Sequence, residues 1–185
     1  MTIAFLNDKL ATFTPPAQTT IIAGTGCTNT GANSIVVGNV NTNKGSTSAV
    51  FGNNNNNTAT HSLLSGNNNT NIGSNSVMVG HTNTNSGQHV FIHGYENHND
   101  TKGTDGKYFD YVDMHGTQLK ANRRCQMLRG QWNKEDNRAL AIWANGSSDT
   151  ARKNVFTIAA NGTPTEKTDG VTLGYLEEAF LGGEW

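Results

Sequence analysis

Glycine recurs every 14 residues through the first half of this 185-residue chain, and no other feature constrains the fold as strongly. The main series consists of Gly24, Gly38, Gly52, Gly66, Gly80 and Gly94. A second series of small residues, seven positions later, consists of Gly31, Gly45, Ala59, Gly73 and Gly87. Repetition at a fixed period indicates a solenoid of stacked coils. Two glycines per repeat predict two short strands joined by two tight turns, since glycine adopts positive φ at little cost.

Asparagine fills two further columns of the repeat. The column three residues after the main glycine starts at Cys27 and continues with Asn41, Asn55, Asn69, Asn83 and Asn97. The column five residues after the glycine holds Asn29, Asn43, Asn57, Asn71, Asn85 and Asn99. Stacking brings equivalent residues one strand spacing apart, so we expect the amides to hydrogen-bond along ladders, as in cross-β structures. This regular spacing argues against a disordered tract, although only 34% of the residues are apolar.

Two adjacent apolar columns precede the main glycine. The column three residues before it contains Ile21, Ile35, Ala49, Leu63, Val77 and Phe91. The column two residues before it contains Ile22, Val36, Val50, Leu64, Met78 and Ile92. Neighbouring residues of a strand point to opposite sides, whereas a coil has one interior. We therefore expect a second copy of the chain to cover the other side, and the pattern leaves open which column lines the interior.

The segments NSIVVGNVNTNKG and NSVMVGHTNTNSG resemble the head repeat of YadA-like trimeric adhesins, in which Ser-Val-Ala-Ile-Gly precedes spaced alanines and a second glycine. The resemblance covers roughly residues 20 to 103, with asparagine where the family has alanine. It implies an all-β fold, a left-handed parallel β-roll assembled as a homotrimer. No secretory signal, coiled-coil stalk or membrane barrel is recognisable, so phage fibres that use the same repeat fit better than a self-exporting adhesin.

Charge separates the repeat from the rest of the chain. Between residues 20 and 99 only Lys44 and Glu96 are charged, whereas charged residues are common farther on. We predict six coils over 20–103, preceded by an attachment or cap segment over 1–19. The net charge of −1 argues against a nucleic-acid partner. The absence of an 18-residue apolar run predicts no membrane insertion.

Residues 104–125 break the register, and we interpret them as an insertion that leaves the solenoid and returns. QMLRGQWNKED then aligns with VFIHGYENHND, which places Gly130 where Gly94 stands. The segments RALAIWANG and KNVFTIAANG each end in Asn-Gly, the strongest short hairpin signal. We therefore predict a degenerate seventh coil and a β-hairpin cap over 126–168, followed by a tail with a short helix over 169–185.

Several residues are candidates for binding. His93 lies just before a main glycine, and a threefold axis would bring three copies together as a metal or anion site. The segment Asp105–Asp113 could bind calcium, although its spacing is not that of an EF-hand. The candidate receptor-binding aromatics are Tyr108, Tyr111, Trp132 and Trp185. No HExxH or GxSxG motif occurs, and we predict no cofactor and no enzymatic activity.

The leading hypothesis is a trimeric fibre or spike of a bacteriophage or phage-like particle. NGSSDTARKNVFTIAANG and TDGVTLGYLEEAF also resemble segments of phage fibres. Such a protein is assembled in the host cytoplasm, joins other virion proteins and contacts a host-surface glycan or protein. One alternative is an ice-binding or surface-adhesive solenoid with an outward ladder of Thr28, Thr42, Thr70 and Thr84. Another is a phage depolymerase or self-cleaving fibre protein.

Overall fold

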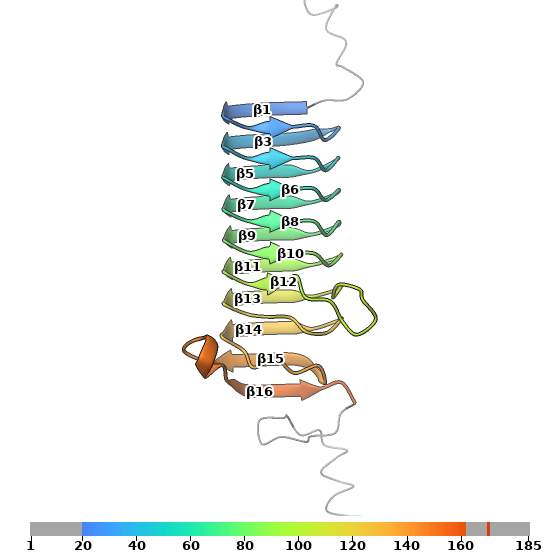
Figure 1. Ribbon diagram of the computed structural model, residues 1–185, viewed down its shortest axis with the longest axis vertical. Helices are drawn as coiled ribbons and strands as arrows, with labels where there is room; N and C mark the ends of the chain where they lie inside the picture. Colours follow the sequence, from blue (N-terminus) through green and yellow to red (C-terminus); the bar gives the residue numbers. More distant parts are fainter. Residues whose placement is uncertain (1–19, 162–169, 171–185) are drawn as a thin grey trace, which may run out of the picture.

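Within residues 20–161 the chain folds into a parallel β-solenoid of about nine turns with almost no helix. The structure, a computed structural model, describes residues 20–161 and 170 (Figure 1). Several predicted segments therefore lie outside the described residues. They are the N-terminal segment 1–19, the final residues 162–168 of the predicted cap, and the tail with its predicted helix and Trp185, apart from Gly170.

Two sheets form the walls of the solenoid (Figure 1). The longer sheet has ten strands: β1 (Thr20–Thr25), β3 (Ser34–Asn39), β5 (Ala49–Asn53), β7 (Leu63–Asn67), β9 (Val77–His81), β11 (Phe91–Tyr95), β13 (Asp113–Thr117), β14 (Met127–Gln131), β15 (Ala139–Asn145) and β16 (Asn154–Ala159). The shorter sheet has six strands: β2 (Thr28–Asn29), β4 (Thr42–Asn43), β6 (Asn56–Asn57), β8 (Thr70–Asn71), β10 (Thr84–Asn85) and β12 (His98–Asn99). Equivalent residues of successive repeats pair in register, as Gly52 pairs with Gly66.

The column two residues before the main glycine lines the interior. Eight side chains of this column in successive rows have no exposed surface: Val36, Val50, Leu64, Met78, Ile92, Met114, Leu128 and Ile142. Burying one such side chain stabilises the fold by roughly 2 kcal/mol. Ile22 belongs to the same column but is 50% exposed, because no described row stacks above β1. The structure thus answers which apolar column faces inward.

The two asparagine columns form the predicted ladders inside the coil. In the first, the Asn69 side-chain amide donates to Asn55 Oδ1 at 3.0 Å and to the Gly80 carbonyl at 2.8 Å. Asn55 Oδ1 also accepts from the Asn69 backbone amide at 3.1 Å. The Asn55 oxygen and the Asn69 amide are thereby both hydrogen-bonded in the buried interior, where an unpaired polar group would be costly.

The second ladder ends where the repeat changes. Asn99 donates to Asn85 Oδ1 at 2.9 Å, but its own Oδ1 is buried without a hydrogen-bond partner in the described structure. In the next coil, Leu119 and Ala121 are buried and belong to the apolar core. At this row the interior positions of the asparagine columns therefore hold apolar side chains in place of amides.

Close stacking, rather than turn geometry alone, explains the glycines. Gly66 has φ +126°, and a Cβ there would lie 1.9 Å from the Gly80 carbonyl oxygen. Gly45 needs no positive φ, yet a Cβ there would lie 1.7 Å from the Ala59 carbonyl oxygen. The left-handed corners are made mostly by other residues, among them Val40 and Asn54, both with φ 54°. The prediction that glycines form the turns is thus only partly right.

The segment 104–125 is not an insertion throughout, so this prediction was wrong. β13 lies within it and pairs in parallel with β11 and β14. Gly116 pairs with Gly94, 22 positions earlier, whereas Gly94 pairs with Gly80, 14 positions earlier, so one coil is eight residues longer. The extra residues form a small excursion in which Lys102 bridges Tyr108 in antiparallel fashion.

The strand β14 follows this additional row, so the coil of Gly130 is not the seventh but a later one. The sequence pattern failed for the missed coil because its positions carry unusual residues. Asp113 stands in an apolar column beside Phe91, and Leu119 stands in an asparagine column. With these residues the row no longer matches the repeat columns, so the repeat pattern does not predict it.

The predicted hairpin at the end of the solenoid forms differently from the expected tight turn. β15 continues the parallel stack through β14, and β16 then pairs with it in antiparallel fashion. The connection from Asn145 to β16 spans residues 146–153 and contains the short 3-10 helix η1 (Asp149–Ala151). Asn145-Gly146 therefore does not form a two-residue turn, and β16 closes the described part of the sheet.

Candidate functional site

The first candidate surface is the outward side of the long sheet, which we call the outer face. In its first six rows it consists of Ile21, Ala23, Ile35, Val37, Ala49, Phe51, Leu63, Ser65, Val77, Val79, Phe91 and His93. Alternation along a strand places these residues opposite the buried column. Ile35 and Phe51 are each 37% exposed, and Phe91 is 39% exposed. A continuous apolar strip of this kind typically marks a contact surface.

A shallow groove of about 620 Å³ runs along this face. Its apolar wall contains Ile35, Ala49, Leu63 and Val77 from four successive rows. The other side of the groove is lined by residues at the coil corners, including His61, and by the serines of the same rows. The groove thus repeats from row to row, as a partner with the same row spacing would require.

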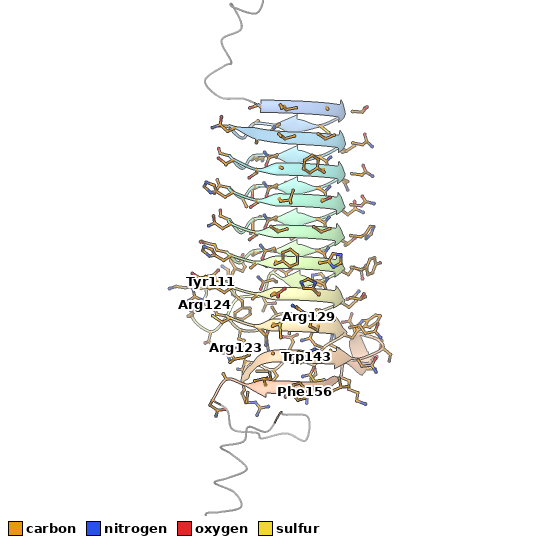
Figure 2. The ribbon with its side chains drawn as sticks, turned by 180° about the vertical axis from the view of Figure 1, so that it is seen from behind. Tyr111, Arg123, Arg124, Arg129, Trp143 and Phe156 are labelled. Atoms are coloured by element: carbon orange, nitrogen blue, oxygen red, sulfur yellow. The ribbon has the colours of Figure 1, made fainter. Side chains whose placement is uncertain are left out.

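The outer face carries charged side chains in the rows of β13 and β14. The Asp113 carboxylate contacts Nε2 of His115 at 3.0 Å and an Arg129 guanidinium nitrogen at 2.7 Å. The His115 ring lies 4.9 Å from that of Phe91 and 5.6 Å, edge on, from that of His93. Farther down, Arg129, Trp143 and Phe156 follow one another on the sheet (Figure 2). The Trp143 and Phe156 rings meet edge to face with their centroids 5.2 Å apart.

The predicted ion-binding residues lie apart from one another. His93 is exposed on the outer face, and within the described residues no group of three or more His, Cys, Asp and Glu side chains could hold a metal. Asp105 accepts from the Lys107 backbone amide in the excursion. Asp110 pairs with Arg124 at 2.7 Å. The carboxylates of Asp105–Asp113 therefore serve separate local contacts.

The predicted receptor-binding aromatics also occupy separate places. Tyr111 is 55% exposed and stacks on His89 with ring centroids 4.8 Å apart. Tyr108 lies in the excursion, with the Lys102 ammonium 5.0 Å from its ring centroid. Trp132 is partly buried at a left-handed corner with φ 42°. The structure does not gather these rings into one aromatic site.

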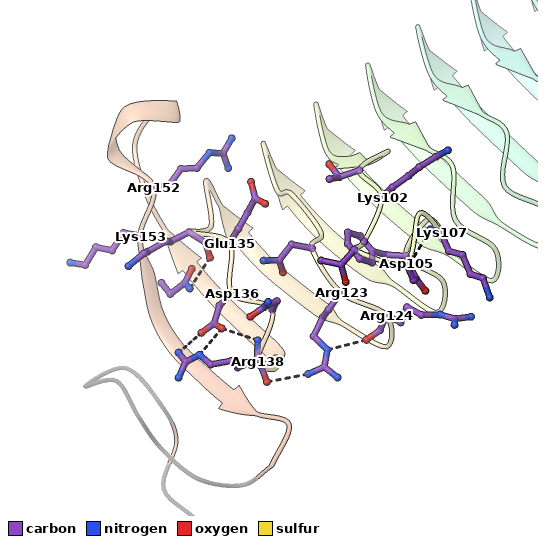
Figure 3. A pocket seen from close by; sticks show the side chains of 18 residues that line it. Lys102, Asp105, Lys107, Arg123, Arg124, Glu135, Asp136, Arg138, Arg152 and Lys153 are labelled. Carbon is purple, nitrogen blue, oxygen red and sulfur yellow. Dashed lines mark hydrogen bonds and ion pairs between the residues drawn. The ribbon is translucent and has the colours of Figure 1, made fainter.

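The second candidate surface is a pocket of about 960 Å³, which we call the basic pocket (Figure 3). It is built by the excursion, by the two coil corners that follow it and by the start of β16. Its cationic lining residues are Lys102, Lys107, Arg123, Arg124, Lys134, Arg138, Arg152 and Lys153. Its anionic lining residues are Asp105, Glu135 and Asp136. No motif in the sequence predicted this pocket.

Ion pairs hold the frame of the basic pocket. Arg138 contacts Asp136 at 2.8 Å, and Arg123 donates to the Arg138 carbonyl at 3.1 Å. Arg152 donates to the Gln118 carbonyl at 2.7 Å, which ties the start of β16 to an earlier coil. These arginines therefore carry structural contacts as well as charge.

Two carboxylates near these elements have lowered pKa values. A hydrogen bond from Arg152, which has the largest effect, and one from Lys120 lower the pKa of Asp149 in η1. A hydrogen bond from His98 lowers the pKa of Asp100 after β12. Both carboxylates thus favour the charged form, as expected for acids beside donors.

The fold and these surfaces define a parallel β-solenoid with an uncovered apolar sheet face and a charged pocket toward its C-terminal end. Models of known protein families gave no match to this sequence, and curated proteins gave none either. Among the described residues, no helix is long and apolar enough to cross a membrane.

Proposed function

We propose that this chain forms a homotrimeric fibre or spike of a bacteriophage or phage-like particle. In this proposal three left-handed rolls of 14-residue coils pack through their outer faces around a common axis. The observation that carries the proposal is the outer face itself, where Ile35, Phe51 and Phe91 remain 37–39% exposed. The adjacent residues Val36, Val50 and Ile92 are fully buried. A solenoid can enclose only one side of its sheet, so the other side needs a partner.

Copies of the same chain fit this face because they share its row spacing. Each row of one copy would meet the same row of the next copy, and a rotation that closes after three copies leaves no copy with an uncovered face. The resemblance of residues 20–103 to the YadA-like head repeat favours three copies. Trimerisation would turn the stack of rows into a stiff shaft.

The C-terminal part of the solenoid is the proposed attachment end. Charged and aromatic side chains concentrate there, whereas the first six rows carry only Lys44 and Glu96 as charged residues. Contacts with a host-surface glycan or protein require such groups, because polar and aromatic side chains give orientation and specificity. The segment before β1 would then join the other virion proteins.

Binding of the purified, fluorescently labelled protein to a panel of intact bacterial strains tests this function. We expect strain-selective binding by the trimer, with unlabelled protein competing for the same sites. Failure to bind any strain, together with a clear thermal-hysteresis signal, would contradict the proposal and favour the ice-binding alternative. Glycan degradation or a reduced intact mass would favour the enzymatic alternative.

A further inference from the structure

We propose that the basic pocket binds an anionic glycan, a saccharide whose units carry carboxylate or phosphate groups. This inference rests on the proposed function only for the biological source of the glycan, the host surface. The pocket itself follows from the fold of one chain, since all its walls come from residues of that chain.

Charge is concentrated in this pocket to an unusual degree. Among the described residues, eight of the 11 lysines and arginines line it, against three of the eight aspartates and glutamates. The whole chain carries a net charge of −1, so the pocket is a local region of positive potential on a nearly neutral protein. Clefts lined by one sign of charge concentrate and hold ligands of the opposite sign.

Three of the cations are available to a ligand. Lys107, Lys134 and Lys153 are exposed, and the described structure gives their ammonium groups no ion pair or hydrogen bond. Arg124 and Arg138, in contrast, each pair with an aspartate. A divalent or repeating anion could therefore contact the three lysines without breaking the frame of the pocket.

The mixture of polar groups favours a saccharide over a nucleic acid. Exposed Asp105 and Glu135 stand among the cations, and carboxylates accept hydrogen bonds from hydroxyl groups, which saccharide units carry and the DNA backbone lacks. Asn154 Oδ1 in the wall is buried and lacks a hydrogen-bond partner in the described structure. A volume of about 960 Å³ suits a few sugar units, since ligand pockets run from about 300 to 1,000 Å³.

Biolayer interferometry with the full-length protein tests this assignment. The probes are polygalacturonate for carboxylate, polyglycerol phosphate for phosphate, and dextran as the neutral saccharide. We expect binding to at least one anionic probe, weakening as salt is raised, and no binding to dextran. The triple variant Lys107→Gln/Lys134→Gln/Lys153→Gln should bind roughly 1,000-fold more weakly, since each of the three lost charged contacts is worth roughly tenfold.

Lys44→Gln is the control for the loss of a lysine elsewhere, because it removes one positive charge from an exposed position outside the pocket. It should bind like the wild type, and circular dichroism should show that all variants are folded. Binding to polygalacturonate alone assigns a carboxylated ligand, and binding to polyglycerol phosphate alone assigns a phosphorylated one.

Four outcomes would overturn the inference: binding to neither anionic probe, equal binding to dextran, equal loss in Lys44→Gln, or single-stranded DNA binding as tightly as the saccharides. Failure of the proposed function is distinguishable from these results. A monomeric protein that binds no bacterial strain but still binds an anionic probe through the three lysines would refute the fibre and leave the pocket assignment intact.

Discussion

Phe91 and Ile92 are neighbours in β11, yet Ile92 is fully buried in the solenoid while Phe91 on the other side of the sheet is 39% exposed. The same relationship holds for Ile35 and Val36 in β3, which are 37% and 0% exposed. A sheet that is apolar on both sides is stable in water only when both sides are covered. Assembly into the proposed trimer would therefore depend on the outer face, whereas the stability of each coil depends on the interior column.

Leu63→Asp should separate the copies without unfolding the chain. Leu63 lies in the outer-face groove, so its replacement would place a charge in the proposed dry contact between copies. Asn56→Asp is the control, because Asn56 is exposed on the short sheet. We expect Leu63→Asp to sediment as a monomer with a β-type circular dichroism spectrum and Asn56→Asp to sediment as the wild type. Identical behaviour of the two variants would show that this face is not the contact.

Val40→Asn should stabilise the protein. Val40 occupies a left-handed corner with φ 54°, which is unfavourable for a β-branched residue, whereas Asn54 occupies the same corner of the next coil with the same φ. Relief of this strain should raise the free energy of unfolding by about 1 kcal/mol. Urea unfolding measures the change, and Asn54→Val should lower stability by a similar amount. A fall in stability in Val40→Asn would contradict the strain argument.

Asn69→Asp should destabilise the protein strongly. Asn69 is fully buried, and its amide group donates to Asn55 Oδ1 and to the Gly80 carbonyl, which a carboxylate cannot do. Loss of two buried hydrogen bonds and burial of a charge should cost about 3 kcal/mol or more. Asn53→Asp is the control, because Asn53 is exposed and only accepts through Oδ1 from Asn39. An equal midpoint of urea unfolding for both variants would show that the ladder does not stabilise the fold.

Acid should loosen the connection between β15 and β16. The pKa of Asp149 is lowered by Arg152 and Lys120, so the folded state favours the carboxylate. This contribution is complete above the ordinary aspartate pKa of about 3.9 and is lost as the pH falls through the lowered folded value. Hydrogen exchange of the β16 amides should therefore be faster in Asp149→Asn than in the wild type at pH 6. The two proteins should converge at the lowest pH, and an unchanged difference there would exclude Asp149 as the cause.

The sequence was sufficient for the solenoid and for the asparagine ladders because both follow from strict repetition. Equivalent residues stack, so a column of identical residues such as Asn55 and Asn69 is enough to predict a ladder. The choice between the two apolar columns was not predictable, since Ile35 and Val36 are similar side chains and only the direction of the coil's closure separates them.

Prediction failed where column identity was lost or where distant segments converge. The row of β13 was missed because Asp113 and Leu119 replace the residues typical of their columns. The basic pocket was missed because Lys107 in the excursion, Lys134 at a corner and Lys153 before β16 come to line one pocket only after the coils stack. The one available signal was the larger number of charged residues after residue 100. That signal concerns composition and does not show where the side chains lie in the fold.

Light scattering after size-exclusion chromatography gives the solution mass of the full-length protein. This mass is the most direct test of whether copies of the chain cover the outer face. Trimerisation through the outer face predicts a mass close to three times the 19.8 kDa of one chain. A stable, folded species of about 19.8 kDa at micromolar concentration would contradict it.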